Sequence, residues 1–360
     1  MPSRRSLVFG ALAAGFCPST GWAQAGSPAF VAAARNPDGA YALYGLSKAG
    51  EAVFNLPLPG RGHAAAAHPG KPVAVAFARR PGDFAIIIDC ATGTTVATLR
   101  TPAGRHFYGH GAYSADGRLL YTTENDFENA RGRIGVWDVA AGYRRIGEHD
   151  SGGVGPHEIV RMPDGQTLAV ANGGIETHPD SGRAKLNVAT MRPNLSYVSL
   201  DGEIVDRVEL AAELRKNSIR HLAVSGDGTV AFAMQWQGET GEQPPLIGMH
   251  RRGFAANLLT GGSEDHRAME NYVGSVAFSG DGTRIAATSP RGGLVQVFDT
   301  CDGQYLGGVR SRDVSGVGAL GDGFAVTSGT GLLVVIDGTV AVRTARHAVA
   351  WDNHLVPVGA

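Results

Sequence analysis

The stretch "GHGAYSADGRLLYTTEND", residues 109–126, combines a Gly-His pair, a turn at Asp116-Gly117 and an apolar run that ends in polar residues. Related phrases begin near residues 62, 109, 156, 220, 274, 316 and 346. Most are followed by an apolar run such as "VAVAFA" or "TLAVAN", a loop, and a further apolar segment such as "FAIIID" or "LVQVFD". Similarity that returns about every 40–50 residues, with four short strands per unit, predicts a β-propeller.

The seven copies predict an all-β, seven-bladed β-propeller closed by its two ends. The last copy, in residues 346–358, is followed by no outer strands, whereas residues 30–59 contain strand-like segments before the first histidine phrase. An unpaired edge in a radial fold favours aggregation, so we expect residues 30–59 and 346–358 to share one blade. The fold would then be a single domain over residues 26–360.

The composition suits a turn-rich β protein. Of the 360 residues, 43% are hydrophobic, 52 are glycine and 18 are proline. The net charge of −1 gives no reason to expect nucleic acid as a partner. The interior of the chain contains no apolar run long enough to span a bilayer.

Residues 1–25 have the pattern of an export signal. Basic residues precede a short apolar stretch, and small residues suit cleavage after Ala25. The pair Arg4-Arg5 resembles the twin-arginine signal, which carries folded proteins. An ordinary secretory signal is the alternative. A lipoprotein site needs a small residue directly before its cysteine, but Phe16 precedes Cys17, so we expect no lipid anchor. The export signal predicts a periplasmic protein.

The mature chain would keep two cysteines, Cys90 and Cys301. They occupy nearly the same turn of two repeats that lie three blades apart. A disulfide requires Cα atoms within about 7 Å, so we expect both thiols to be free.

One face of the propeller gathers most of the polar residues of interest. In this fold the innermost strand of each blade starts at that face, and the loop between the second and third strands returns to it. The candidate metal ligands come from the histidine phrases: His63, His110, His157, Glu158, His221 and His347. The candidate ligand-binding residues come from the loops and one phrase: Arg79, Arg80, Glu124, Asn125, Asp126, Asn172, Arg220, Gln235 and Arg291.

These residue types predict a metal or anion site. Neutral imidazole binds Fe, Cu and Zn, and a histidine with an ordinary pKa of about 6.5 is mostly neutral at pH 7. The arginines disfavour a bare cation but suit a carboxylate-bearing ligand such as an anionic metal chelate. A structural role is the alternative for each histidine, because Gly109-His110 followed by Trp137-Asp138 resembles the GH…WD phrase of WD-repeat blades.

Other cofactor motifs do not support a different chemistry. The sequence has no CxxCH haem motif and no P-loop. Gly316, Gly318 and Gly321 match a dinucleotide fingerprint, but they lie in a strand and turn of the repeat with no following helix. We therefore expect neither haem nor a nucleotide cofactor.

Several phrases together resemble one protein family. They include "RGHAAAAHP", "FARRPGDF", "GPHEIVRMPDG", "VANGGIETHPDSGRAKLN" and "MRPNLSYVSLDG". The chain resembles the exported bacterial propellers known as domain of unknown function 1513, which are similar in fold to YVTN- and WD-type propellers. Genes of that family commonly lie beside imelysin-like proteins and a di-haem oxidoreductase, which implies iron or copper handling with periplasmic iron-uptake proteins as partners. The resemblance supplies no catalytic residues.

Two classes of function remain open. The first is a periplasmic binding or scaffold protein for metal acquisition that uses the histidine-rich mouth. The alternative is a propeller enzyme, a hydrolase or lactonase, that uses a His/carboxylate site with a bound cation.

Overall fold

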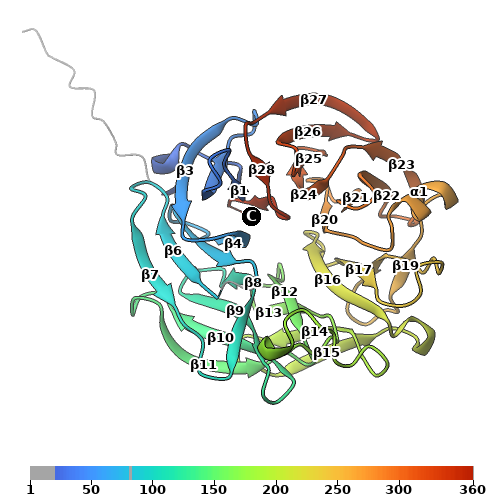
Figure 1. Ribbon diagram of the computed structural model, residues 1–360, viewed down its shortest axis with the longest axis horizontal. Helices are drawn as coiled ribbons and strands as arrows, with labels where there is room; N and C mark the ends of the chain where they lie inside the picture. The colour runs from blue at the N-terminus through green and yellow to red at the C-terminus, as the bar shows by residue number, and fades with distance from the viewer. Residues whose placement is uncertain (1–20, 81–82, 360) are drawn as a thin grey trace, which may run out of the picture.

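The computed structural model describes residues 21–80 and 83–359 of the chain. These residues form seven antiparallel sheets arranged radially, and the chain colours follow one another around the ring (Figure 1). The structure confirms the predicted all-β, seven-bladed propeller. The short helices of the described residues are η1 (Gly21–Ala25), η2 (Pro179–Ser181), η3 (Ala212–Leu214) and α1 (Ser263–Ala268).

Blade 1 is built from both ends of the chain. Its strands are β28 (Ala350–Trp351), β29 (Val356–Pro357), β1 (Phe30–Arg35), β2 (Tyr41–Leu46) and β3 (Ala52–Leu58). Ala34 pairs with Trp351, and Val31 pairs with Val356, both in antiparallel register. The predicted closure of the ring is therefore confirmed, and β28 lies beside β1 in Figure 1.

The other six blades each contain four consecutive strands. Blade 2 contains β4 (Gly62–Ala67), β5 (Val73–Ala78), β6 (Ala85–Asp89) and β7 (Thr95–Leu99). Blade 3 contains β8 (Arg105–Tyr113), β9 (Leu119–Asp126), β10 (Arg131–Asp138) and β11 (Arg144–Asp150). Blade 4 contains β12 (Pro156–Arg161), β13 (Thr167–Asn172), β14 (Asn194–Ser199) and β15 (Ile204–Glu209).

The remaining blades complete the ring in the same order. Blade 5 contains β16 (Asn217–Val224), β17 (Val230–Trp236), β18 (Ile247–His250) and β19 (Asn257–Leu259). Blade 6 contains β20 (Ser275–Phe278), β21 (Arg284–Ser289), β22 (Leu294–Asp299) and β23 (Tyr305–Arg310). Blade 7 contains β24 (Val314–Leu320), β25 (Gly323–Ser328), β26 (Leu332–Asp337) and β27 (Val340–Arg346).

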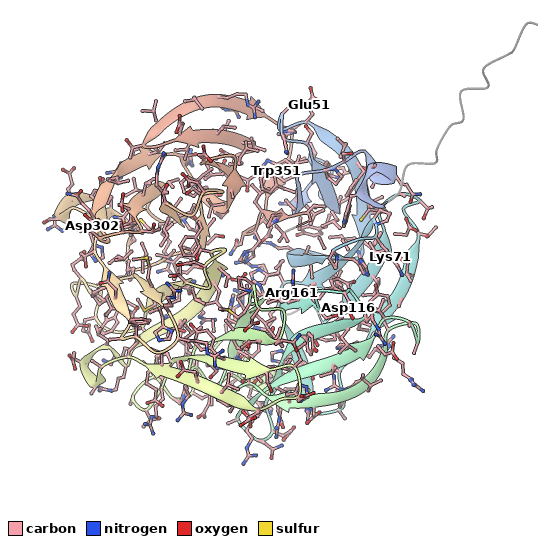
Figure 2. All side chains as sticks on the ribbon, turned by 180° about the vertical axis from the view of Figure 1, so that it is seen from behind. Glu51, Lys71, Asp116, Arg161, Asp302 and Trp351 are labelled. Carbon is pink, nitrogen blue, oxygen red and sulfur yellow. The ribbon has the colours of Figure 1, made fainter. Side chains whose placement is uncertain are left out.

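The hydrophobic core lies between neighbouring blades. Phe77 of blade 2 packs with Phe107 and Trp137 of blade 3 in one buried cluster. Trp351 occupies the equivalent contact between blades 1 and 7, and in Figure 2 it lies nearer the centre than Glu51 at the rim. Because each blade buries its apolar faces only against its neighbours, the closing strands complete the core as well as the hydrogen bonding.

Two further expectations concern the cysteines and the N-terminus. Cys90 and Cys301 are both free thiols, as predicted. The Arg4-Arg5 motif and Cys17 lie outside the described residues. Trp22 of η1 donates a hydrogen bond to the carbonyl of His68 at 2.8 Å, so residues just before the predicted cleavage point contact blade 2. No helix within the described residues is long and apolar enough to span a membrane.

Candidate metal centre

The inner strands direct histidines toward the axis of the propeller through β-bulges. The pairing of β4, β8, β12 and β16 with the next strand shifts at or beside His63, His110, His157 and His221. A bulge adds an unpaired residue and changes the direction of a side chain. His354 is placed similarly, because residues 352–355 interrupt the pairing of blade 1 between Trp351 and Val356.

The five imidazoles form one cluster. The Nε2 atoms of His63 and His110 lie 3.2 Å apart. The ring centroid of His354 lies 4.9 Å from that of His63, 4.7 Å from that of His110 and 4.9 Å from that of His221. The ring centroid of His157 lies 4.9 Å from that of His110 and 4.8 Å from that of His221. Five of the seven blades therefore supply imidazoles to this histidine centre (His63, His110, His157, His221 and His354).

Ligand atoms within the histidine centre are close enough to share a metal ion. Two triplets have nitrogen atoms within 4.8 Å of one another: His63, His110 and His157, and His110, His221 and His354. Two nitrogen ligands at about 2.0–2.1 Å from one metal ion lie at most about 4.2 Å apart, so separations of up to 4.8 Å need only small shifts of the side chains. The arrangement is thus compatible with a transition-metal site.

Glu158 adds one carboxylate to the centre. One of its oxygens lies 3.2 Å from Nδ1 of His221, and the other lies 3.8 Å from Nδ1 of His110. The backbone N–H of Leu222 donates a 3.1 Å hydrogen bond to the same oxygen that faces His221. Burial raises the pKa of Glu158 to about 7, although the positive form of His354 would act in the opposite direction. Glu158 can therefore bind a metal directly or orient two of the imidazoles.

Three ring nitrogens of the histidine centre have no protein partner. They are Nδ1 of His63, Nδ1 of His157 and Nε2 of His354, and all three are buried. Buried polar atoms are normally hydrogen-bonded, so each unpaired nitrogen requires an explanation.

Other buried histidines do have partners. His250 contacts the Tyr197 hydroxyl at 2.7 Å, and His266 Nε2 lies 2.9 Å from the carbonyl of Pro244. Nδ1 of His68 accepts hydrogen bonds from two backbone N–H groups of the following turn. Unpaired nitrogens among the buried histidines therefore occur at the histidine centre, within the described residues.

The electrostatic environment keeps the imidazoles neutral. Burial is the largest cause that lowers the pKa of His221 and of His354 to about 3. Burial also lowers the pKa values of His63, His110 and His157 well below 6.5, and neighbouring positive charges act in the same direction. Neutral imidazoles retain a lone pair for a metal.

A pocket of about 170 Å³ adjoins the histidine centre. Its lining comprises His63, Arg79, Arg80, Tyr108, His157, Arg183, Arg220, His221, Gln235, Tyr272 and Asn353. Arg79, Arg80, Arg220 and Gln235 of the predicted ligand-binding set therefore do converge with the histidines. Arg291 does not line the pocket, but its guanidinium lies 4.4 Å from the ring centroid of Tyr272, which does.

The other predicted loop residues are held by contacts within their own blade or with the next one, and they do not line this pocket. Glu124 accepts hydrogen bonds from both terminal nitrogens of Arg145, at 2.5 and 3.0 Å. Asp126 lies 3.7 Å from Arg105, and Asn125 donates to the carbonyl of Thr177 at 3.1 Å. Asn172 is buried in a hydrogen-bond network with Ser151, Asn194 and Ser196. These contacts give the four residues structural partners.

The structure also separates His347 from the other candidate ligands. Its Nε2 lies 2.9 Å from the carbonyl of Gly50, and its ring packs on Trp351 at 5.2 Å between blades 7 and 1. His354 takes the corresponding place in the centre, and it was not among the predicted ligands. The segment "WDNHLVP" contained the signal for this position. Its histidine lies between the two short strands, β28 and β29, that close the ring, once residues 347–349 are assigned to the connection.

The fold and the site define a class of protein: a seven-bladed β-propeller with histidines from five blades at its axis. The sequence matches the family described as "Protein of unknown function (DUF1513)" over residues 56–358. The chain therefore belongs to this family, which confirms the resemblance found in the sequence. No curated protein matches the chain significantly.

Solved structures give a likeness in fold. A chain of Kuenenia stuttgartiensis hydrazine synthase superposes with a TM-score of 0.62 at 13% sequence identity. The match covers 88% of this chain and 97% of that chain. At this identity the likeness shows the propeller fold alone, so the function is argued from the site.

Proposed function

We propose that the protein is a metal-binding propeller that holds a first-row transition-metal ion in the histidine centre. The observation that supports this proposal most directly is the set of unpaired buried nitrogens on His63, His157 and His354. A bound metal ion would satisfy nitrogen lone pairs that the protein leaves without a donor. Imidazole donors suit Zn, Cu, Fe and Ni, and Cu(II) has the highest affinity in the divalent series.

The geometry favours a shared ligand over purely structural histidines. His110 makes its contacts with His63 and Glu158 of the two neighbouring blades. In its own blade, Trp137 donates its indole N–H to Thr122 at 2.9 Å, and Thr122 donates to Glu124 at 3.1 Å. This series of structural hydrogen bonds does not include His110. A role in metal acquisition or handling follows as the function that uses this arrangement.

Titration of metal-free protein with Cu(II) and Zn(II), with calorimetry and elemental analysis as readouts, tests the proposal. We expect at least one ion to bind with a Kd below about 10 μM, and His110→Ala or His354→Ala to weaken binding at least about tenfold. His347→Ala is the matched control and should bind like the unchanged protein. If neither ion binds, or if the three variants behave alike, the proposal is wrong.

We also propose that the protein works in the periplasm after twin-arginine export. The support is the Arg4-Arg5 pair ahead of a short apolar stretch. Changing both arginines to lysine should leave precursor in the cytoplasm, as measured by fractionation and immunoblotting. Normal export of this variant would indicate the general secretory route.

A further inference from the structure

The pocket beside the histidine centre carries positive charge at its wall. Arg79, Arg80, Arg183 and Arg220 line it, and no aspartate or glutamate is among its described lining residues. Lys185 lies close to this wall. Burial is the largest cause that lowers its pKa, and the charges of Arg220 and Arg291 lower it further.

Most of these guanidinium groups are not neutralised by the protein. Over residues 21–80 and 83–359, Arg80, Arg183 and Arg220 have no carboxylate within 4 Å, whereas Arg79 lies 2.9 Å from Asp352. The Nε of Arg220 is buried without any hydrogen-bond partner. A guanidinium that is buried and unpaired is costly, so an external anion would stabilise it.

The β-bulge of β16 explains why the charge lies next to the metal ligands. The pairing of β16 with β17 shifts between Ile219 and His221, which leaves Arg220 as the extra residue. Arg220 and His221 both line the pocket in consequence. A ligand that contacts Arg220 is therefore placed beside an imidazole of the centre.

This juxtaposition is unfavourable for a bare cation. The imidazoles are neutral, and the carboxylates near them are Glu158 and Asp352. Asp352 is already paired with Arg61 and Arg79, so a divalent ion meets more positive than negative charge. An anion bound to the arginines reverses the sign of the local potential. Paired N–H donors of arginine also fit carboxylate oxygens in a bidentate geometry.

We infer that the pocket binds a small polycarboxylate anion, with one carboxylate on Arg80 and Arg220 and another on the metal ion. This inference rests on the proposed metal site and names the anion that accompanies the metal. The cavity of about 170 Å³ has room for several atoms, given that one water takes about 30 Å³ of liquid volume. It is too small for a macromolecular segment.

Succinate titration of the copper-loaded protein tests the inference, with calorimetry for affinity and electron paramagnetic resonance for the copper environment. The decisive variant is Arg80→Gln/Arg220→Gln, and Arg183→Gln gives a second variant on a loop should the double variant fail to fold. Arg118→Gln is the control, because its side chain is 82% exposed in the turn between β8 and β9.

We expect succinate to bind with a Kd below about 1 mM and to alter the copper spectrum. The double variant, or Arg183→Gln in its place, should bind succinate at least about tenfold more weakly. Its copper affinity without succinate should not fall, because the substitution removes positive charge beside the imidazoles. Equal succinate binding by these variants and the control, or an unchanged copper spectrum, would overturn the inference. Inorganic phosphate that binds more tightly than succinate would overturn the carboxylate assignment.

The copper titration comes before any succinate is added, so the two proposals fail separately. Absence of both copper and zinc binding overturns the proposed function. Copper binding without any effect of succinate overturns only the polycarboxylate inference.

Discussion

The Nε2 atoms of His63 and His110 lie 3.2 Å apart, although 47 residues separate the two histidines in the chain. A neutral imidazole carries its proton on one ring nitrogen and a lone pair on the other. One of the two Nε2 atoms can donate to the other, but the buried Nδ1 of His63 then stays without a partner. The fold thus assembles imidazoles whose hydrogen-bonding capacity exceeds what their neighbours satisfy.

Metal binding should stabilise the folded protein, because the unfolded chain does not bring the five histidines together. At a free metal concentration of about one hundred times Kd, the gain in free energy of unfolding is about 2.7 kcal/mol. Thermal melts with and without Cu(II) or Zn(II) measure it. The His354→Ala variant should lose most of the gain and His347→Ala should keep it. A similar gain in both variants would place the metal elsewhere.

Gly109 should be required for the position of His63. Its φ is +98°, and a Cβ atom there would lie 2.6 Å from Cδ2 of His63. Gly109→Ala therefore combines backbone strain with a clash, and we expect a cost of about 2–4 kcal/mol in unfolding free energy together with weaker metal binding. Denaturant melts and the copper titration provide the two readouts.

Gly142→Ala separates strain from clash. Gly142 has a φ of +68°, and a Cβ there would meet no atom within 4 Å. Its cost should be about 1 kcal/mol, with unchanged copper affinity. Equal effects of the two substitutions would show that the contact with His63 is unimportant.

Closure of the ring should depend on Trp351. Its side chain is buried with Tyr44 and Leu333, and its ring centroid lies 5.3 Å from that of Tyr44. Trp351→Ala should lower the free energy of unfolding by about 3–5 kcal/mol, as expected for a large buried ring. Val342→Ala in β27 is the exposed control and should stay within about 0.5 kcal/mol. Comparable melts for both variants would argue against the closing contact.

The repeat phrase predicted the fold well because each copy encodes one inner strand and its turn. The positions of His63, His110, His157 and His221 followed from the same register, and the structure brings all four together. His354 was not predicted as a ligand, because the closing strand is interrupted between Trp351 and Val356 and its register does not follow the repeat.

The loop residues show a different reason for limited predictability. Glu124 lies near the end of a second strand, as a residue of the mouth would, but its side chain pairs with Arg145 two strands farther out. That partner depends on which face of the sheet each side chain takes and on the packing of long arginine side chains across the blade. The spacing of residues along one strand does not contain this information.

The Arg105–Glu148 pair should make part of the stability depend on acid pH. Glu148 accepts hydrogen bonds from Arg105 and, at 3.1 Å, from Arg145. These contacts, with the Arg105 hydrogen bond first, lower the pKa of Glu148 from 4.5 to about 2. The folded protein therefore holds this carboxylate charged at a pH where the unfolded chain binds a proton. The stabilisation is complete above about pH 4.5 and is lost as the pH falls toward about 2.

Glu148→Gln removes this charged pairing, and urea unfolding at pH 7, 4 and 3 measures the consequence. The variant should be less stable at pH 7 by no more than about 1 kcal/mol, because the pair is partly exposed to solvent. The difference from the unchanged protein should be slightly smaller at pH 4 and clearly smaller at pH 3, because the unfolded chain then binds a proton while the folded carboxylate, with its pKa of about 2, stays charged. Glu51→Gln, at the rim in Figure 2 and without an ion pair among the described residues, is the control and should show no such trend. A difference that stays constant from pH 7 to pH 3 would show that the Glu148 contacts act without its charge.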